Sequence, residues 1–296
     1  MKRFLSLEAS EMLDLSKEEL LNSIKASEGR VVVSENVVVK EPVVDGITSS
    51  EIARAFGADL LLLNVFDMNN PLVKGLESTD PVKDLRQLTG RPVGVNLEPV
   101  DLNAPLLEQR KDIPMGRIAT EESLKKAEEL GFDYICLTGN PGTGVSTKKI
   151  AETIHLAKKH FSGIIIAGKM HGAGVDEQIL DSENIDLLLE AGADIILLPA
   201  VGTVPGITME NLTKAIEYIH RKSRLVMTTI GTSQESSPKE IIRRIALDNK
   251  ICGADLQHIG DAGYGGLGNY MNIFEMSRTI RGDRHTIKMM ASSIRR

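Results

Sequence analysis

The sequence predicts an α/β protein that folds as a (β/α)8 barrel, or TIM barrel, with one domain over residues 1–296. A Gly-x-Asp triplet precedes an apolar run four times, at Gly57, Gly131, Gly192 and Gly253, with spacings of 74, 61 and 61 residues (131−57, 192−131, 253−192). Four more apolar runs lie between these copies, and helical patterns separate all eight. Regular alternation of this kind is typical of a parallel sheet, and eight units close into a barrel of about 250 residues. A doubly wound open sheet is the rival, but the even spacing and the count of eight favour the barrel.

Residues 1–28 are expected to form an N-terminal helical extension. Ser16-Lys17-Glu18-Glu19 is a capping box that begins a helix running to about Ala26. We expect this helix to cover one end of the barrel or to pack on a partner subunit.

The strands are expected in two interleaved sets. One set occupies residues 31–35, 92–97, 163–169 and 225–230, and the other follows the aspartates of the four triplets. Each triplet glycine comes just past a helical segment, where a left-handed conformation ends the helix; these segments are 51–56, 120–130, 184–191 and 239–252. The triplets therefore mark the starts of strands two, four, six and eight.

Residues 276–296 are expected to form a basic C-terminal extension. It carries Arg278, Arg281, Arg284, His285, Lys288, Arg295 and Arg296. A solvated face or a subunit contact is the expected role, with anion binding as the alternative, so a homo-oligomer stays open.

Composition narrows the class of protein. Hydrophobic residues make up 42% and charged residues 26%, which is ordinary for a globular protein. A net charge of −6 argues against a nucleic-acid partner. Cys136 and Cys252 fit no disulfide framework and are expected to be buried thiols. Because there is no signal-peptide core and no apolar run near ~20 residues, we expect a cytoplasmic protein without a membrane partner.

Candidate site residues follow from the strand ends, because catalytic groups of such barrels lie at the carboxyl ends of the strands. Seven of the eight strands end on polar or ionisable groups, which favours a polar pocket at one mouth. These groups include Glu35, Asn64, Asp67, Asn96, Glu98, Thr138, Asn140, Lys169, His171, His258 and Asp261.

Strand five gives the most specific hypothesis. Side chains alternate along a strand, so Lys169 and His171 are expected to share one side with Ala167, pointing into the mouth. There Lys169 would neutralise an anion or form a Schiff base, and the alternative is pairing with a carboxylate such as Glu98.

The other candidate catalytic residues are proton-transfer groups. Glu98 belongs to an inward-facing set with Gly94 and Asn96, and His258 and Asp261 end strand eight. A histidine at this mouth either moves protons or holds a loop. His155, His160 and His220 lie on helical segments, where a surface role is the default. Glu35, Asn64, Asn96, Asn140 and Thr138 are predicted to bind substrate.

Phosphate is expected on the loops after strands seven and eight, as is frequent in these barrels. The residues predicted to hold it are Gly231, Thr232, Ser233, Gly260, Gly263 and Gly265. The loop 139–147 also begins a helix as anion sites do, but it lacks the lysine of a Walker motif. Plain connectors or lids are the alternative reading of such glycine-rich loops.

Several stretches resemble a family of uncharacterised bacterial TIM-barrel proteins, some of them labelled haloacid-dehalogenase-like hydrolases. The matching stretches are 94–99, 137–141, 167–171 (Ala-Gly-Lys-Met-His), 198–206, 230–235, 258–264 and 281–286. The resemblance covers nearly the whole chain. It implies no mechanism, since a dehalogenase-type phosphatase needs an Asp-x-Asp pair and this chain has none.

The predicted function is an enzyme of the lyase (aldolase) or isomerase type rather than a hydrolase, acting on a small phosphorylated metabolite such as a sugar phosphate. Lys169 would polarise or capture the carbonyl, and His171 or Glu98 would move protons. The first alternative is a metal-dependent hydrolase or lyase that binds a divalent ion through Glu35, Asp67 and Glu98. The second is a non-catalytic sensor of a phosphorylated ligand.

Overall fold

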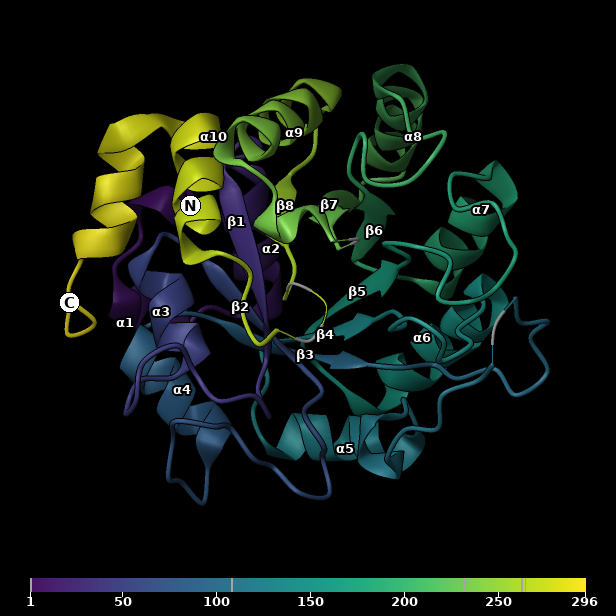
Figure 1. The fold of residues 1–296 in the computed structure, drawn as a ribbon, viewed down its shortest axis with the longest axis horizontal. Coiled ribbons are helices and arrows are strands. Elements are labelled where there is room, and N and C mark those ends of the chain that lie inside the picture. The colour runs from purple at the N-terminus through teal and green to yellow at the C-terminus, as the bar shows by residue number, and fades with distance from the viewer. Residues whose placement is uncertain (1, 108, 232, 262, 264) are drawn as a thin grey trace.

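The computed structural model describes residues 2–107, 109–231, 233–261, 263 and 265–296. Its centre is a closed barrel in which eight parallel strands pair in chain order, each with the next and the last with the first. The strands are β1 Val31–Val37, β2 Leu60–Asn64, β3 Val93–Leu97, β4 Tyr134–Leu137, β5 Ile164–Gly168, β6 Ile195–Pro199, β7 Leu225–Ile230 and β8 Leu256–Ile259. The predicted (β/α)8 barrel is confirmed (Figure 1).

Helices surround the barrel and connect its strands (Figure 1). They are α3 Ser49–Ala55, α4 Pro81–Thr89, α5 Glu121–Glu129, α6 Thr147–His160, α7 Ser182–Ala191, α8 Met209–Arg221, α9 Lys239–Cys252 and α10 Tyr270–Ala291. Among the described residues, no helix combines the length and the hydropathy that a membrane crossing needs. Cys136 and Cys252 are buried free thiols, as expected.

The Gly-x-Asp triplets lie where helices end and even-numbered strands begin. Their glycines have positive φ angles between 75° and 107°, which favours glycine. Each aspartate also accepts a hydrogen bond from a backbone N–H of the preceding strand. The pairs are Asp59 with Val32, Asp133 with Val93, Asp194 with Ile165 and Asp255 with Val226, at 2.8–2.9 Å. We call these four residues the strand-start aspartates.

Alternation along the strands divides the core into two layers. Val31 and Val33 of β1 and Ile164 and Ile166 of β5 belong to the cluster inside the barrel. Val32, Ile165 and Ala167 point outward and pack under the helices with the larger cluster. The interior is therefore filled by side chains, and a ligand can enter at the end where the strands finish.

The N-terminal segment closes the floor of the barrel, the end where the strands begin. The short helices η1 Phe4–Ser6 and α1 Ala9–Leu13 precede α2 Lys17–Lys25. Ser16 forms the predicted capping box with Glu19. Apolar side chains of the segment, including Phe4, Leu5 and Ile24, join the cluster inside the barrel. The first of the two expected roles, covering one end of the barrel, is the one that the structure shows.

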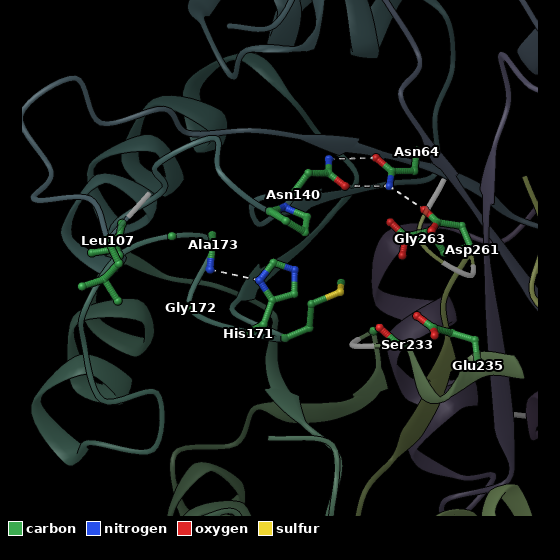
Figure 2. A pocket seen from close by; sticks show the side chains of 16 residues that line it. Asn64, Leu107, Asn140, His171, Gly172, Ala173, Ser233, Glu235, Asp261 and Gly263 are labelled. Atoms are coloured by element: carbon green, nitrogen blue, oxygen red, sulfur yellow. Dashed lines mark hydrogen bonds between the residues drawn. The ribbon is translucent and has the colours of Figure 1, made fainter. Parts of the chain in front are cut away.

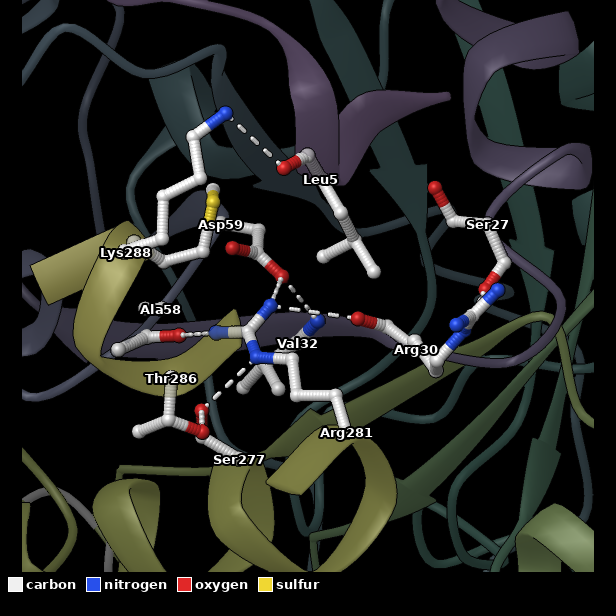
Figure 3. A network of polar contacts seen from close by, with 12 residues as sticks. Leu5, Ser27, Arg30, Val32, Ala58, Asp59, Ser277, Arg281, Thr286 and Lys288 are labelled. Carbon is white, nitrogen blue, oxygen red and sulfur yellow. Dashed lines mark hydrogen bonds and ion pairs between the residues drawn. The ribbon is translucent and has the colours of Figure 1, made fainter. Parts of the chain in front are cut away.

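The C-terminal residues do not form a separate extension. Residues 276–291 belong to α10, which follows β8 and packs beside α9 and α3, with a kink at Gly282 (φ 70°). Arg281, whose side chain has no exposed surface, pairs with Asp59 and donates to the Arg30 carbonyl oxygen (Figure 3). Lys288 donates to the Leu5 carbonyl oxygen. Arg281 and Lys288 therefore join this segment to the floor of the barrel, where they contact a buried carboxylate and backbone carbonyl oxygens.

Candidate active site at the barrel mouth

A cavity of about 380 Å³ opens at the mouth of the barrel, the end where the strands finish. Its polar side chains come from six separate strand ends, as Figure 2 shows in part: Glu35, Asn64, Asn140, His171, Ser233, Glu235 and Asp261. Gly231 and Gly263 add backbone, and Leu107, from the long loop after β3, completes one side. This convergence is the feature expected of a small-molecule site in this fold.

One wall is a network of amides and carboxylates. Asn64 Nδ2 donates to Asp261 Oδ2 at 2.8 Å and to Asn140 Oδ1 at 3.0 Å, while Asn140 Nδ2 donates back to Asn64 Oδ1 at 3.1 Å (Figure 2). Asn96 Nδ2 also donates to Asn64 Oδ1, at 3.2 Å. The network fixes the carboxylate of Asp261 at the edge of the cavity.

Glu98 supports this wall from behind. Its Oε1 accepts from Arg117 at 2.7 Å and from Asn140 Nδ2 at 2.9 Å, and its Oε2 accepts from the Asn140 backbone N–H at 2.9 Å. Glu98 is buried and does not line the cavity. Its inward direction agrees with the sequence prediction, but its oxygens orient Asn140 rather than face a ligand.

Glu35 follows Val31 and Val33 on the face of β1 that points into the barrel, and it lines the cavity. His258 Nε2 lies 3.2 Å from Glu35 Oε2, and the His258 ring is fully buried. Burial is the largest influence on Glu35 and raises the pKa of its carboxyl. The contact with His258 lowers this pKa in part, and the charge of Asp261 raises it. Glu35 can therefore keep a proton at a higher pH than an exposed glutamate does.

Glu235 is a site residue that the sequence interpretation did not include. It lies in the turn η3 Gln234–Ser236 after β7, is buried, and lines the cavity. Burial raises the pKa of its carboxyl, as does the charge of Asp261. Gly260 packs against it, because a Cβ there would lie 2.9 Å from Glu235 Oε1. Glu235 follows the predicted phosphate-binding residue Ser233 by two positions, which could have indicated a place near the site. The sequence does not predict that its side chain is buried.

His171 stands across the cavity from these carboxylates (Figure 2). Its Nδ1 accepts a hydrogen bond from the Ala173 backbone N–H at 2.9 Å, so the neutral ring carries its proton on Nε2. Burial, followed by the charge of Lys169, lowers the pKa of His171 to about 4. At neutral pH this side chain is a hydrogen-bond donor without charge.

The predicted orientation of Lys169 is wrong. Strand β5 points Ile164 and Ile166 inward, so Lys169 lies on the outer side with Ala167, and it does not line the cavity at the mouth. Its Nζ pairs with Glu177 Oε1 at 2.5 Å, and only 2% of its side chain is exposed. Glu177 also accepts from the Thr147 backbone N–H and hydroxyl, at 3.0 and 2.7 Å. Lys169 is thus paired with a carboxylate, which was the alternative role predicted for it, but the partner is Glu177 rather than Glu98. We call Lys169, Glu177 and Thr147 the Glu177 cluster.

The remaining predicted residues lie in different places. Gly231, Ser233 and Gly263 of the expected phosphate loops line the cavity, whereas Gly260 and Gly265 do not; Thr232 lies outside the described residues. Thr138 is buried, and its hydroxyl has no hydrogen-bond partner in the described part of the chain.

The three residues of the predicted metal site do not come together. Asp67 accepts from the Asn69 backbone N–H in its own turn, and Glu98 pairs with Arg117. Within the described ranges, no group of three or more His, Cys, Asp and Glu side chains is placed to hold a metal ion.

Fold and cavity together define a (β/α)8 barrel with a candidate active site at the carboxyl ends of its strands. Residues 5–296 match the family described as "Domain of unknown function (DUF7916)", so the chain belongs to that family. No curated protein matches the sequence. Nothing in these findings supports the haloacid-dehalogenase-like label.

Two solved structures show the same fold. One is 2,3-dimethylmalate lyase, described as a PEP mutase/isocitrate lyase superfamily member, with a TM-score of 0.53 and 12% identity over 85% of this chain and 83% of that one. The other is the BexX/CysO complex of Amycolatopsis orientalis, with a TM-score of 0.51 and 12% identity over 88% of this chain and 91% of that one. At this identity the likeness concerns the fold alone.

Proposed function

We propose that the protein is an enzyme of the lyase or isomerase type that works by acid–base catalysis at the barrel mouth. The observation that carries the proposal is Glu35, a buried carboxylate with a raised pKa that lines the cavity. A pKa nearer the working pH makes a carboxylate a better proton carrier. One solved structure of the same fold is 2,3-dimethylmalate lyase, which favours this class without assigning a substrate.

For an aldol-type cleavage, the steps balance without a cofactor. Glu35 removes the proton from a substrate hydroxyl, the carbon–carbon bond breaks, and its electron pair forms an enolate. The Nε2–H of neutral His171 donates a hydrogen bond to the enolate oxygen, and the proton held on Glu35 then returns to the enolate carbon. Isomerisation uses the same groups, with Glu35 removing a proton next to the carbonyl.

The charges that line the cavity disfavour the predicted sugar-phosphate substrate. Gly231, Ser233 and Gly263 do offer backbone and hydroxyl groups. However, Glu35, Glu235 and Asp261 line the same space, and no lysine or arginine does so among the described residues. A phosphate dianion beside carboxylates is unfavourable without a cation, so we propose a small polar substrate that lacks a phosphate group.

The test is proton exchange in deuterium oxide, followed by NMR, across a panel of β-hydroxy carbonyl compounds with and without phosphate. We expect the native protein to cleave one of them or to exchange its α-proton, and Glu35→Gln to lose about 10²–10⁴-fold of that rate. Glu152→Gln, on the exposed face of α6, is the matched control and should leave the rate unchanged. An unaffected rate in Glu35→Gln would rule out this carboxylate as the proton carrier.

The same panel separates the two alternatives. Loss of turnover with a chelator, restored by a divalent ion, would favour the metal-dependent hydrolase or lyase. Ligand-dependent thermal shifts without any turnover would favour the non-catalytic sensor.

A further inference from the structure

We infer that the substrate held at the barrel mouth carries a positively charged amino group, bound by Glu235 and Asp261. The inference rests on the proposed function, because it takes the same cavity to be the substrate site. It adds the chemical class of the ligand, which acid–base chemistry at Glu35 does not fix.

The first argument is the charge of the cavity wall. Three carboxylates line the cavity, and His171 opposite them is uncharged at neutral pH. In the described part of the chain no lysine or arginine lines it, and the buried cation Lys169 is paired with Glu177 on the outer side of the barrel. A cation bound at this wall would offset the mutual repulsion of the carboxylates.

The second argument is an unused acceptor. Glu235 is only 2% exposed, and its Oε2 has no hydrogen-bond partner among the described residues, although the side chain lines the cavity. A buried carboxylate oxygen without a donor is costly, and an ammonium group brings three donors. Glu235 and Asp261 line the same cavity, the charge of Asp261 acts on Glu235, and Asn64 fixes the position of Asp261 (Figure 2). A small ammonium group placed between them would contact both.

The third argument separates an amine from a metal ion. Divalent ions select oxygen ligands gathered around one point, and the described residues contain no group of three acidic or histidine side chains so placed. An ammonium group needs only one or two carboxylates at hydrogen-bond distance. Glu98, which would be the next carboxylate along the wall, is already paired with Arg117.

The test compares three matched probes by NMR titration of the ¹⁵N-labelled protein: 3-aminopropane-1,2-diol, glycerol and glycerol 3-phosphate. They share a three-carbon frame and differ in charge. We expect the amine to shift the backbone amides of Ala173 and Gly174, which line the cavity, and to bind roughly tenfold or more tightly than glycerol. Glycerol 3-phosphate should cause no such shift.

Variants locate the effect. Glu235→Gln and Asp261→Asn keep the shape of each side chain and should each weaken amine binding roughly tenfold, whereas Glu152→Gln should not. Tighter binding of the phosphate probe, displacement of the amine by magnesium chloride, or no binding of the amine overturns the inference. Since binding needs no turnover, a failure here leaves proton exchange through Glu35 standing. Conversely, if the amine binds but no compound of the panel is cleaved or exchanges its α-proton, the proposed acid–base catalysis is rejected and the amine site is retained.

Discussion

At the residue scale, His171 gives a pH-dependent prediction. Its pKa in the folded protein is about 4, below the ordinary value of about 6.5, because of burial and then the charge of Lys169. Between these values the unfolded chain binds a proton that the folded protein does not, so folding stability falls as pH drops from 6.5 to 4. The loss attributable to this ring is at most about 3 kcal/mol. Urea unfolding of His171→Gln should therefore depend less on pH in this window than unfolding of the native protein.

His160→Gln is the control for that measurement, because His160 lies on α6 with part of its side chain exposed. It should leave the pH dependence as in the native protein. A direct check is the NMR titration of the His171 ring, which should show no midpoint near 6.5. A midpoint there would show that the ring is solvated and charged at mildly acidic pH, and its role as a neutral donor would fail.

Residue identities at the site were predictable to the extent that strand ends were predictable. Asn64, Asn96, Asn140 and Asp261 do form one network, because adjacent parallel strands bring their carboxyl ends together. The sequence did not predict which of these side chains would face the cavity and which would orient its neighbours. Glu98 faces inward as expected, but its partner Arg117 lies 19 positions further along the chain, at the end of the short 3-10 helix η2 Met115–Arg117. A partner of this kind leaves no periodic signal.

At the element scale, the loop after β5 is held by the Glu177 cluster, and this gives the next prediction. The first turn of α6 has no acidic residue of its own, so Glu177 supplies the carboxylate that its N-terminus favours. Glu177→Gln should leave Lys169 buried without a charge partner and should loosen the loop that carries His171. Hydrogen–deuterium exchange of the 170–176 backbone should become faster, while the strands keep their protection.

A charge pair on the exposed face of the same helix is the matched control. Lys149 and Glu152 lie 3.1 Å apart, with 42% and 52% of their side chains exposed. Pairs of this kind contribute about 0–1 kcal/mol, so Glu152→Gln should leave the exchange of 170–176 as it is in the native protein. Equal protection of this loop in Glu177→Gln and in the native protein would show that the cluster does not hold it.

The wrong orientation of Lys169 shows where pattern reasoning stops. Alternation was sound within β5, but the register could not be read from Ile164, Ile165 and Ile166, since both faces of this strand are apolar. The inward prediction rests on the cost of placing an unpaired charge under the helices. The structure neutralises that charge with Glu177, eight residues ahead. The ion pair with Glu177 stabilises the outward orientation of Lys169, and the sequence of β5 alone does not indicate this pair.

At the scale of the whole molecule, the fold was predictable because it repeats. Four Gly-x-Asp triplets fixed the start of every second strand, and the observed bounds follow them within a few residues. The glycines end helices through local backbone geometry, which a sequence pattern records. The same aspartates also accept hydrogen bonds from the preceding strand, a long-range role that the pattern did not reveal.

The strand-start aspartates should differ in importance according to the burial of their cationic partners. Asp59 and its partner Arg281 are both fully buried at the floor (Figure 3), whereas Asp255 pairs with His220, whose side chain is 38% exposed. Asp59→Ala leaves an uncompensated buried guanidinium and should lower the free energy of unfolding by about 3–5 kcal/mol. Asp255→Ala removes a hydrogen bond beside a solvated partner and should cost about 1–3 kcal/mol.

Urea unfolding at one pH measures both aspartate variants, and a double variant isolates the cause. Asp59→Ala combined with Arg281→Met removes both charges, so it should recover part of the stability that Asp59→Ala loses alone. If the double variant were instead as unstable as the sum of the two single changes, the ion pair would not be the reason. The contribution of Asp59 would then lie in the hydrogen bond from Val32, which joins the start of β1 to the start of β2 and which all four aspartates reproduce around the barrel floor.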